Sequence, residues 1–321
     1  MIGEFLVEIK NADVAYKFIL KRNITVLKGE GASGKTLLYD LVDIFNNSDQ
    51  KGVTVRVTGG ASIETLNRQR FNDGVLLTRS KQNRIFIIDE DSNFVNSNDF
   101  AVQAINSGFY FILINRDKLD QLSCSIHEIY QLKQTHDRFI EFIPLYPNDS
   151  YGNIKLHHKV VTEDKGAGRQ FFSRYDSSLD VEGADGRSDI IHHVPAMEPT
   201  LVVADGAAFG FNMATTLPLV QEADGGLIVK ESFEYVILKS GIVHSKDSRM
   251  LTLDKPAVDS RLYFSWEQYY TELLCGVTAG TPLAYKKEHL PQEYSNPVAA
   301  EAILHVYGLN SVDAEKTKFF K

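Results

Sequence analysis

The chain has 321 residues, 43% of them apolar and 24% charged, which is typical of a globular protein of about two domains. No apolar run approaches the roughly 20 residues that cross a bilayer, and the first residues lack the pattern of a signal peptide. The two cysteines, Cys124 and Cys275, lie far apart in sequence and indicate free thiols in a reducing compartment. We therefore expect a cytoplasmic protein with no membrane partner.

The net charge of −8 is unevenly distributed along the chain. Residues 1–146 carry a net charge of −1, and the remainder carries −7. This excess argues against broad, non-specific binding of nucleic acid by the second half, because such binding favours a basic surface. Acidic residues gathered around a metal site would also give the second half an excess of negative charge.

The first 146 residues alternate between predicted strands and helices. Strands are predicted at Phe5–Lys10, Tyr16–Lys21, Asn23–Lys28, Val53–Val57, Arg84–Ile88 and Phe109–Ile114. Helices are predicted at Lys35–Phe45, Ser62–Arg70 and Asp99–Ser107. Apolar strands separated by helices indicate an α/β domain with a parallel sheet covered on both faces, here over residues 1–146.

Two prolines and a glycine in residues 144–152 mark a linker, after which the alternation resumes. Strands are predicted at Lys159–Val161, Leu201–Ala204 and Leu227–Lys230, and helices at Arg169–Tyr175, Asn212–Gln221, from Ser265 onward and at Pro297–Tyr307. We expect a smaller α/β domain over residues 153–240, followed by a mostly helical C-terminal region over residues 241–321.

The clearest motif is Gly29-Glu-Gly-Ala-Ser-Gly34-Lys35-Thr36, which fits the phosphate-binding (Walker A) pattern G-x-x-x-x-G-K-[ST]. Its glycines allow backbone N–H groups to converge on an anion, and the following helix adds its positive N-terminal end. Lys35 is expected to reach the β- and γ-phosphates, and Thr36 to bind Mg²⁺. The residues assigned to the nucleotide are Gly29, Gly31, Ser33, Gly34, Lys35 and Thr36. The motif predicts a site for ATP, or another nucleoside triphosphate, with Mg²⁺.

A second motif is the apolar strand Arg84–Ile88, which ends in Asp89 and Glu90. In P-loop enzymes an aspartate at such a strand end helps to hold Mg²⁺, and Asp89 is assigned that role. Glu90 is then placed to polarise the attacking water as a general base. The alternative is that these carboxylates are the polar end of a core strand.

The first half resembles the ATPase domains of the SMC, ABC and overcoming-lysogenisation-defect (OLD) groups. The resemblance rests on the N-terminal hairpin, Gly29–Thr36 and Ile85–Glu90. It departs from these groups in having no Leu-Ser-Gly-Gly-like segment before Asp89. Those ATPases use that segment to close a nucleotide across a dimer, so the resemblance does not extend to this mode of dimerisation.

Further carboxylates follow the predicted strands of the second half. Glu163 comes after the strand at Lys159–Val161, and Asp205 directly follows Leu201–Ala204. Adjacent parallel strands would bring these two carboxylates to one edge of the sheet, where hard oxygen ligands suit Mg²⁺ or Mn²⁺. The candidate metal ligands here are Glu163, Asp205, Glu231 and Glu234. The alternative is a set of polar strand ends in an ordinary α/β domain.

This pattern resembles a Toprim domain, the metal-binding fold of topoisomerases, primases and OLD nucleases, over residues 157–240. The first motif of that family is a glutamate after an apolar strand and maps to Glu163. The second is Asp-x-Asp, which here is Asp205-Gly-Ala207, so the second aspartate is missing. The two-metal chemistry of such nucleases then requires Glu231 or Glu234 as a substitute.

The order of an SMC-like ATPase and a Toprim-like half resembles OLD nucleases and related phage-defence systems. It implies an ATPase coupled to a metal-dependent nuclease that acts on DNA, in phage defence or a mobile element. A second hypothesis is an ATP-dependent switch or scaffold whose Toprim-like half binds a protein partner or another copy of the chain. A small-molecule kinase is a third, although Glu90 beside Asp89 suits activation of water better.

Overall fold

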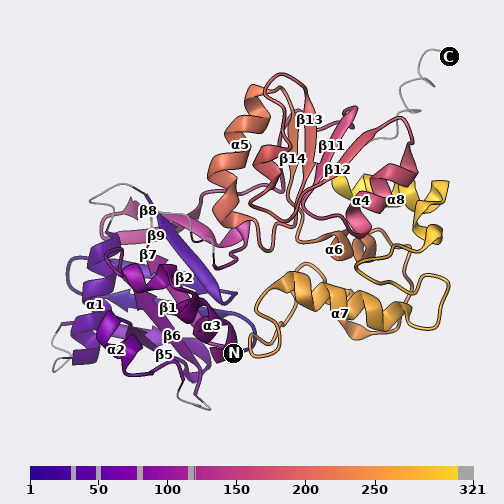
Figure 1. Cartoon of the computed structure of the whole chain (residues 1–321). Helices are drawn as coiled ribbons and strands as arrows, with labels where there is room; N and C mark the ends of the chain where they lie inside the picture. The colour runs from indigo at the N-terminus through magenta and orange to yellow at the C-terminus, as the bar shows by residue number, and fades with distance from the viewer. Residues whose placement is uncertain (30–33, 48–51, 78–81, 115–118, 120, 310–321) are drawn as a thin grey trace. The chain divides into compact units, whose positions relative to one another are not determined.

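The computed structural model describes residues 1–29, 34–47, 52–77, 82–114, 119 and 121–309. It is an α/β protein that divides into two compact units (Figure 1). The first unit comprises Met1–Pro147 and Ala257–Ser265, and the second comprises Asn148–Pro256 and the chain from Trp266 onward. Each unit is built around its own sheet.

In the described residues of the first unit, nine strands form one mixed sheet in the order β4-β1-β2-β9-β8-β3-β7-β6-β5. The strands are β1 (Phe5–Lys10), β2 (Ala15–Leu20), β3 (Ile24–Lys28), β4 (Thr54–Val57), β5 (Ser62–Thr65), β6 (Arg84–Ile88), β7 (Tyr110–Ile114), β8 (Ile129–His136) and β9 (Phe139–Pro144). Strands β8, β3, β7, β6 and β5 pair in parallel, whereas β4, β1 and β2 pair antiparallel. The predicted parallel pairing holds around β3, and the predicted N-terminal hairpin is the antiparallel pair β1 and β2, so that the sheet as a whole is mixed.

The helices of this unit are α1 (Lys35–Asn47), α2 (Arg68–Asn72) and α3 (Asn98–Ser107). Helix α1 buries Leu38, Leu41 and Val42 in a mixed aliphatic and aromatic core with strands of the central sheet. A second cluster is aromatic, with Phe100 of α3 packed edge-on against Phe111 of β7. Alternate side chains of a strand point to opposite faces, so the buried strands are covered on both sides.

Residues 62–70 do not form the single helix that the sequence predicts. Ser62–Thr65 is instead the edge strand β5, in which Ile63 and Thr65 are buried and alternate with half-buried neighbours. Asn67 then begins the short helix α2 by accepting a hydrogen bond from the Arg70 N–H at 3.0 Å. The two-residue periodicity of a strand therefore prevails over the helical spacing.

In the described residues of the second unit, five strands form a sheet in the order β10-β14-β13-β11-β12. They are β10 (Ser150–Gly152), β11 (Lys159–Thr162), β12 (Asp180–Gly183), β13 (Thr200–Val203) and β14 (Gly226–Ile228). The last four pair in parallel, and β10 is an antiparallel edge. The helices are α4 (Ala167–Tyr175), α5 (Met213–Glu222), α6 (Phe233–Lys239), α7 (Trp266–Thr278) and α8 (Pro297–Tyr307).

The described part of the C-terminal region, expected over residues 241–321, is shared between the two units. Helices α7 and α8 belong to the second unit, whereas Ala257–Ser265 returns to the first. There the Ser260 hydroxyl donates to the Gly108 carbonyl at 2.6 Å, and Ile2 pairs with Asp259 in an isolated bridge. These contacts link chain segments more than 150 residues apart, which no local pattern signals.

Candidate functional site

The first candidate site lies where β3 runs into α1. Gly29 and Gly34 have φ angles of +130° and +89°, a region that favours glycine. The Tyr16 hydroxyl donates to the Gly34 carbonyl at 2.7 Å and stands close against the Gly34 α-carbon. The residues between these glycines, including the predicted Gly31 and Ser33, lie outside the described residues. Both ends of the loop therefore have positive φ angles, which explains why each position is a glycine.

Lys35 is the first residue of α1 and is buried, with 5% of its surface exposed. Its amine donates to the Gly29 carbonyl at 2.6 Å, so it lies against the residue at which the loop begins. Thr36 follows in the first turn of α1 and is exposed. A buried lysine amine and the N-terminus of a 13-residue helix together favour an anion here.

Asp89 and Glu90 follow β6, separated from β3 by the one intervening strand β7. Asp89 Oδ1 is buried and has no hydrogen-bond partner among the described residues. Burial, followed by the charge of Asp89, raises the pKa of Asp40, which places the Asp89 carboxylate near α1. A buried carboxylate oxygen without a partner fits a ligand of Mg²⁺, an ion that proteins hold with few carboxylates and with substrate phosphates.

Replacing Gly34 with alanine is expected to destabilise the protein more than the same change at Gly52. Gly52 has a similar φ of +83°, but an added methyl group there meets none of the described residues within 4 Å. At Gly34 the methyl group would lie 3.0 Å from Tyr16 Oη and 3.2 Å from Ile140 Cδ1. Backbone strain is expected to lower the free energy of unfolding by about 1–2 kcal/mol in both variants. Crowding is expected to lower it by about 1 kcal/mol or more in addition in Gly34→Ala.

Urea unfolding followed by far-ultraviolet circular dichroism measures both losses. If Gly34→Ala and Gly52→Ala lower the free energy of unfolding equally, contact between the added methyl group and Tyr16 does not destabilise the protein.

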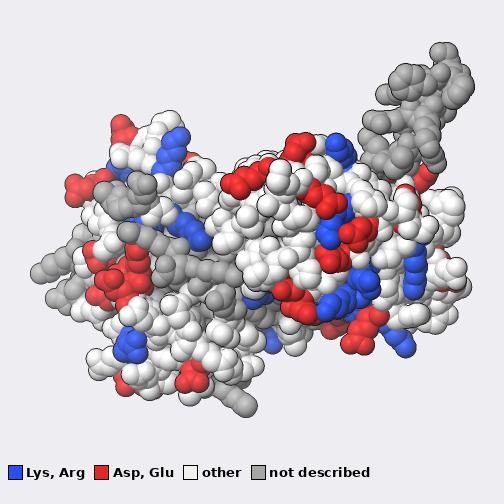
Figure 2. Space-filling view, turned by 45° about the horizontal axis from the view of Figure 1, so that its top comes forward, with Lys and Arg blue, Asp and Glu red and all other residues white. Residues whose placement is uncertain are grey.

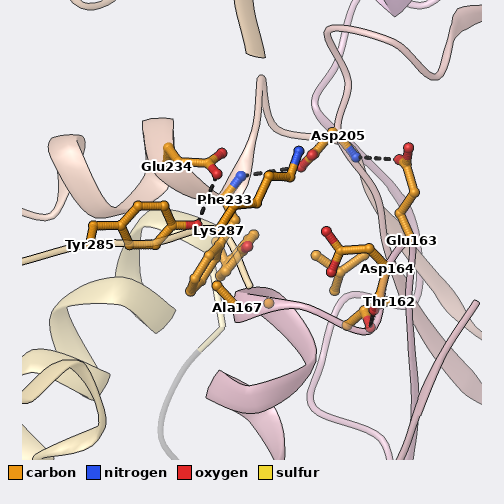
Figure 3. Close-up of a pocket in the computed structure, with 12 residues that line it drawn as sticks. Thr162, Glu163, Asp164, Ala167, Asp205, Phe233, Glu234, Tyr285 and Lys287 are labelled. Atoms are coloured by element: carbon orange, nitrogen blue, oxygen red, sulfur yellow. Dashed lines mark hydrogen bonds between the residues drawn. The ribbon is translucent and has the colours of Figure 1, made fainter. Parts of the chain in front are cut away.

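The second candidate site lies at the carboxyl ends of the adjacent strands β11 and β13 (Figure 3). Glu163 Oε2 accepts a hydrogen bond from the Asp205 N–H at 2.9 Å, so the two predicted carboxylates do lie together. Asp205 Oδ1 in turn accepts from the Phe233 N–H at the start of α6, at 3.2 Å. One oxygen of each carboxylate is thereby fixed by a backbone donor.

Glu234, the next residue of α6, brings a third carboxylate to the same place. It is 1% exposed, and its Oε1 accepts from the Tyr285 hydroxyl at 2.8 Å (Figure 3). Its Oε2 is buried without a hydrogen-bond partner among the described residues. Glu231, the fourth predicted ligand, is not among the described residues that line this pocket.

The pocket has a volume of about 30 Å³, which suits an ion and a water molecule rather than an organic ligand. Its described lining is Thr162, Glu163, Asp164, Ala167, Gly168, Val203, Asp205, Phe233, Glu234, Tyr285, Lys287 and Tyr307. Among the described residues, no group of three or more histidine, cysteine, aspartate or glutamate side chains is already arranged to hold a metal ion. Glu163, Asp205 and Glu234 thus share the pocket without converging on one point.

Burial and neighbouring carboxylates raise the pKa values of two acids in this pocket. Burial raises the pKa of Glu163 to about 7, although the hydrogen bond from the Asp205 N–H opposes the rise. Burial, followed by the charges of Glu267 and Glu163, raises the pKa of Asp205 well above its ordinary value. A bound cation would stabilise both ionised forms, and this charge pattern suits a metal site.

Lys287, Glu267 and Tyr285 belong to this site but were not predicted. Burial lowers the pKa of Lys287, but the charges of Glu267 and Asp205 raise it above the ordinary range, and its amine forms an ion pair with Glu267. These residues follow β11 by more than 100 positions and come from α7 and the segment after it. Their spacing in the sequence carries no signal of the proximity that the fold creates.

Ala207, which is 5% exposed, occupies the position at which the Toprim resemblance would require a second aspartate. Its N–H donates to the Glu231 carbonyl at 3.1 Å, so the backbone of this turn is fixed against the end of the next strand. The turn therefore presents a buried methyl group in place of a second carboxylate.

No protein-family model, curated protein or solved structure matches the chain. In the part of the chain that the structure describes, no helix combines the length and apolar character needed to cross a membrane. The assignment of function consequently rests on the chemistry of the two sites.

Proposed function

We propose that the first unit is a P-loop ATPase of the kind found in the SMC, ABC and OLD groups. The observation that carries the proposal is the geometry around α1. Gly29 and Gly34 have positive φ angles, which favour glycine, and the buried Lys35 side chain donates from its amine to the Gly29 carbonyl. A lysine amine held at a glycine-rich loop and a helix N-terminus is suited to polyphosphate.

The residues around the loop have separate tasks in this proposal. Lys35 exchanges the Gly29 carbonyl for the β- and γ-phosphates when a nucleotide enters. Thr36 and Asp89 hold Mg²⁺, which neutralises charge on the phosphates. Glu90, beside Asp89, accepts a proton from the attacking water.

The kinase alternative differs in the acceptor of the phosphoryl group. A hydrolase releases inorganic phosphate from ATP when no other acceptor is present, whereas a kinase requires its substrate. Phosphate release by the purified chain with ATP and Mg²⁺ alone therefore separates the two, and the position of Glu90 favours release.

For the second unit we propose a Toprim-like, metal-dependent nuclease that acts on DNA in the cytoplasm, as in OLD systems. Glu163 and Asp205 on adjacent strand ends, together with Glu234, support a divalent cation in the pocket. When bound, the ion would activate water and neutralise charge on a phosphodiester. On the face shown in Figure 2, acidic and basic side chains are interspersed, so DNA contact would be local.

Plasmid nicking tests this second proposal. With Mn²⁺ and ATP, wild type is expected to nick supercoiled DNA, and Glu163→Gln to reduce the rate by about 100-fold because it removes a charged metal ligand. Glu198→Gln is the matched control, since Glu198 is exposed and lies two residues before β13. Background-level nicking by wild type and Glu163→Gln alike would exclude the nuclease.

A nuclease-silent scaffold remains the second candidate, and Ala207 is the observation that favours it. In this case ATP would change the assembly state of the chain, or its binding to a protein partner, without cleavage of DNA. Light scattering with and without ATP and Mg²⁺ detects such assembly, and metal-dependent cutting rules the candidate out.

A further inference from the structure

Tyr16, on β2, lies outside the Walker A motif and contacts the described end of its loop. Its side chain is buried, with 1% of its surface exposed, and its hydroxyl donates to the Gly34 carbonyl at 2.7 Å. Burial raises the pKa of Tyr16 above its ordinary value, so the hydroxyl keeps its proton and acts as a donor. A polar contact from the core of the sheet therefore ends on the residue that precedes Lys35.

The Gly34 carbonyl accepts two hydrogen bonds. One comes from the Leu38 N–H at 3.0 Å and belongs to the first turn of α1, and the other comes from Tyr16. Because the peptide group is planar and trans, a fixed Gly34 carbonyl also fixes the direction of the Lys35 N–H. The N–H groups of the first helical turn point out of the N-terminal end, where they bind anions. The contact from Tyr16 thus acts on a peptide group at the proposed phosphate site.

Two neighbouring strands close the space around Gly34. Tyr16 of β2 and Ile140 of β9 are in register in a parallel pair. A methyl group added to Gly34 would lie 3.0 Å from Tyr16 Oη and 3.2 Å from Ile140 Cδ1. Since the same peptide group is also hydrogen-bonded to Tyr16, it has little room to rotate.

We propose that Tyr16 is a positioning residue of the phosphate loop: its hydroxyl, with Ile140 beside it, holds the Gly34–Lys35 peptide group in the orientation that presents the Lys35 N–H to a polyphosphate. The inference rests on the proposed nucleotide site of the first unit and adds the part of the sheet that shapes it. Binding groups lose affinity when the neighbours that hold them in place are removed. Tyr16 acts through the loop backbone, so its loss weakens phosphate binding without removal of a phosphate ligand.

Tyr16→Phe tests the proposal, because it removes one oxygen atom and keeps the aromatic ring. Calorimetric titration of the full chain with ATP and Mg²⁺ is expected to show binding about fivefold weaker, the effect of one ordinary hydrogen bond. Inorganic tripolyphosphate is expected to lose affinity by the same factor, since the loop contacts phosphate. In phosphate release from ATP, KM is expected to rise about fivefold while kcat stays within about twofold of wild type, because the loop binds the ground state and the transition state alike.

Tyr110→Phe is the matched control. Tyr110 is also 1% exposed, and its hydroxyl donates to the Gly3 and Lys21 carbonyls at 3.0 and 3.2 Å. It begins β7, which runs parallel to β3, so it lies at the end of the sheet opposite the loop. Each variant loses one buried hydroxyl that donates to the backbone, and each should lower Tm by about 2–4 °C. Only Tyr16→Phe is expected to weaken ATP binding.

Wild-type affinity for ATP in a folded Tyr16→Phe protein would overturn the positioning role. Equal weakening in Tyr110→Phe would also overturn it, since the effect would then follow from lost stability alone. A loss of affinity for ATP but not for tripolyphosphate would place the effect at the base or sugar, again against the proposal.

If Tyr16→Phe does not fold, Ile140→Val takes its place. This change removes only the Cδ1 atom beside Gly34 and is expected to weaken binding of ATP and of tripolyphosphate by about twofold. Unchanged affinity for both ligands would contradict the role of these two strands. Failure of the wild-type chain to bind ATP would instead contradict the proposed function of the first unit, and the role of Tyr16 with it.

Discussion

Replacement of Lys35 by alanine is expected to weaken binding of ATP with Mg²⁺ by about 30-fold or more, corresponding to about 2 kcal/mol or more. The amine lies at the start of the loop, where it donates a hydrogen bond to the Gly29 carbonyl. Its loss removes the positive charge that would contact the β- and γ-phosphates. Calorimetric titration with ATP measures the change.

The control for this variant is Lys17→Ala in the same unit. Lys17 lies on β2, is 60% exposed and pairs with Glu8 at 3.0 Å, away from the loop in sequence. Thermal unfolding shows whether each variant is folded. Wild-type affinity in a folded Lys35→Ala protein would contradict the phosphate-binding role.

Glu90→Gln is expected to lower the rate of ATP hydrolysis by about 10²- to 10⁴-fold while ATP affinity stays close to that of wild type. Glutamine keeps the size and hydrogen-bonding capacity of the side chain but cannot accept a proton from water. Phosphate release at saturating ATP gives the rate, and the titration used for Lys35 gives the affinity.

The neighbouring Asp91 provides a control of the same chemical kind. It is exposed, so Asp91→Asn changes one charge near the strand end without removing the proposed base. A similar fall in the rate of ATP hydrolysis in both variants would indicate a general effect of charge. A wild-type rate in Glu90→Gln would show that another residue is the base.

The sequence predicts the secondary structure on either side of residues 29–34 well because its determinants are contiguous. The strand before Gly29 and the helix from Lys35 appear where their local patterns place them, and β6 spans Arg84–Ile88 as predicted. Positive φ angles at Gly29 and Gly34 are properties of a few adjacent residues, which a motif can specify. The activity inferred from the motif stays a prediction.

Errors in the first unit arise where tertiary pairing decides the structure. Ser62–Thr65 became a strand because it pairs with β6, a partner that begins about 20 residues later. Strands β8 and β9 were not predicted, and β9 joins β2 in parallel across more than 120 residues of chain. Such pairings depend on which edges the rest of the fold leaves available.

In the second site, too, local patterns predict some of the residues and tertiary structure brings in the others. Glu163 and Asp205 could be placed together because parallel strand ends share one edge of a sheet. Glu234 was one of two equivalent candidates, and its burial beside Tyr285 distinguishes it from Glu231. Lys287 reaches the pocket through a segment without regular structure, which periodicity cannot reveal.

We propose above all that residues 29–36 bind a nucleoside triphosphate with Mg²⁺. Titration of the wild-type chain with ATP, in Mg²⁺ and again in EDTA, tests it most directly. We predict saturable binding of one ATP per chain that weakens markedly when the metal is removed, because Thr36 and Asp89 then lose the ion they share with the phosphates. Absence of saturable binding in Mg²⁺ would contradict the account.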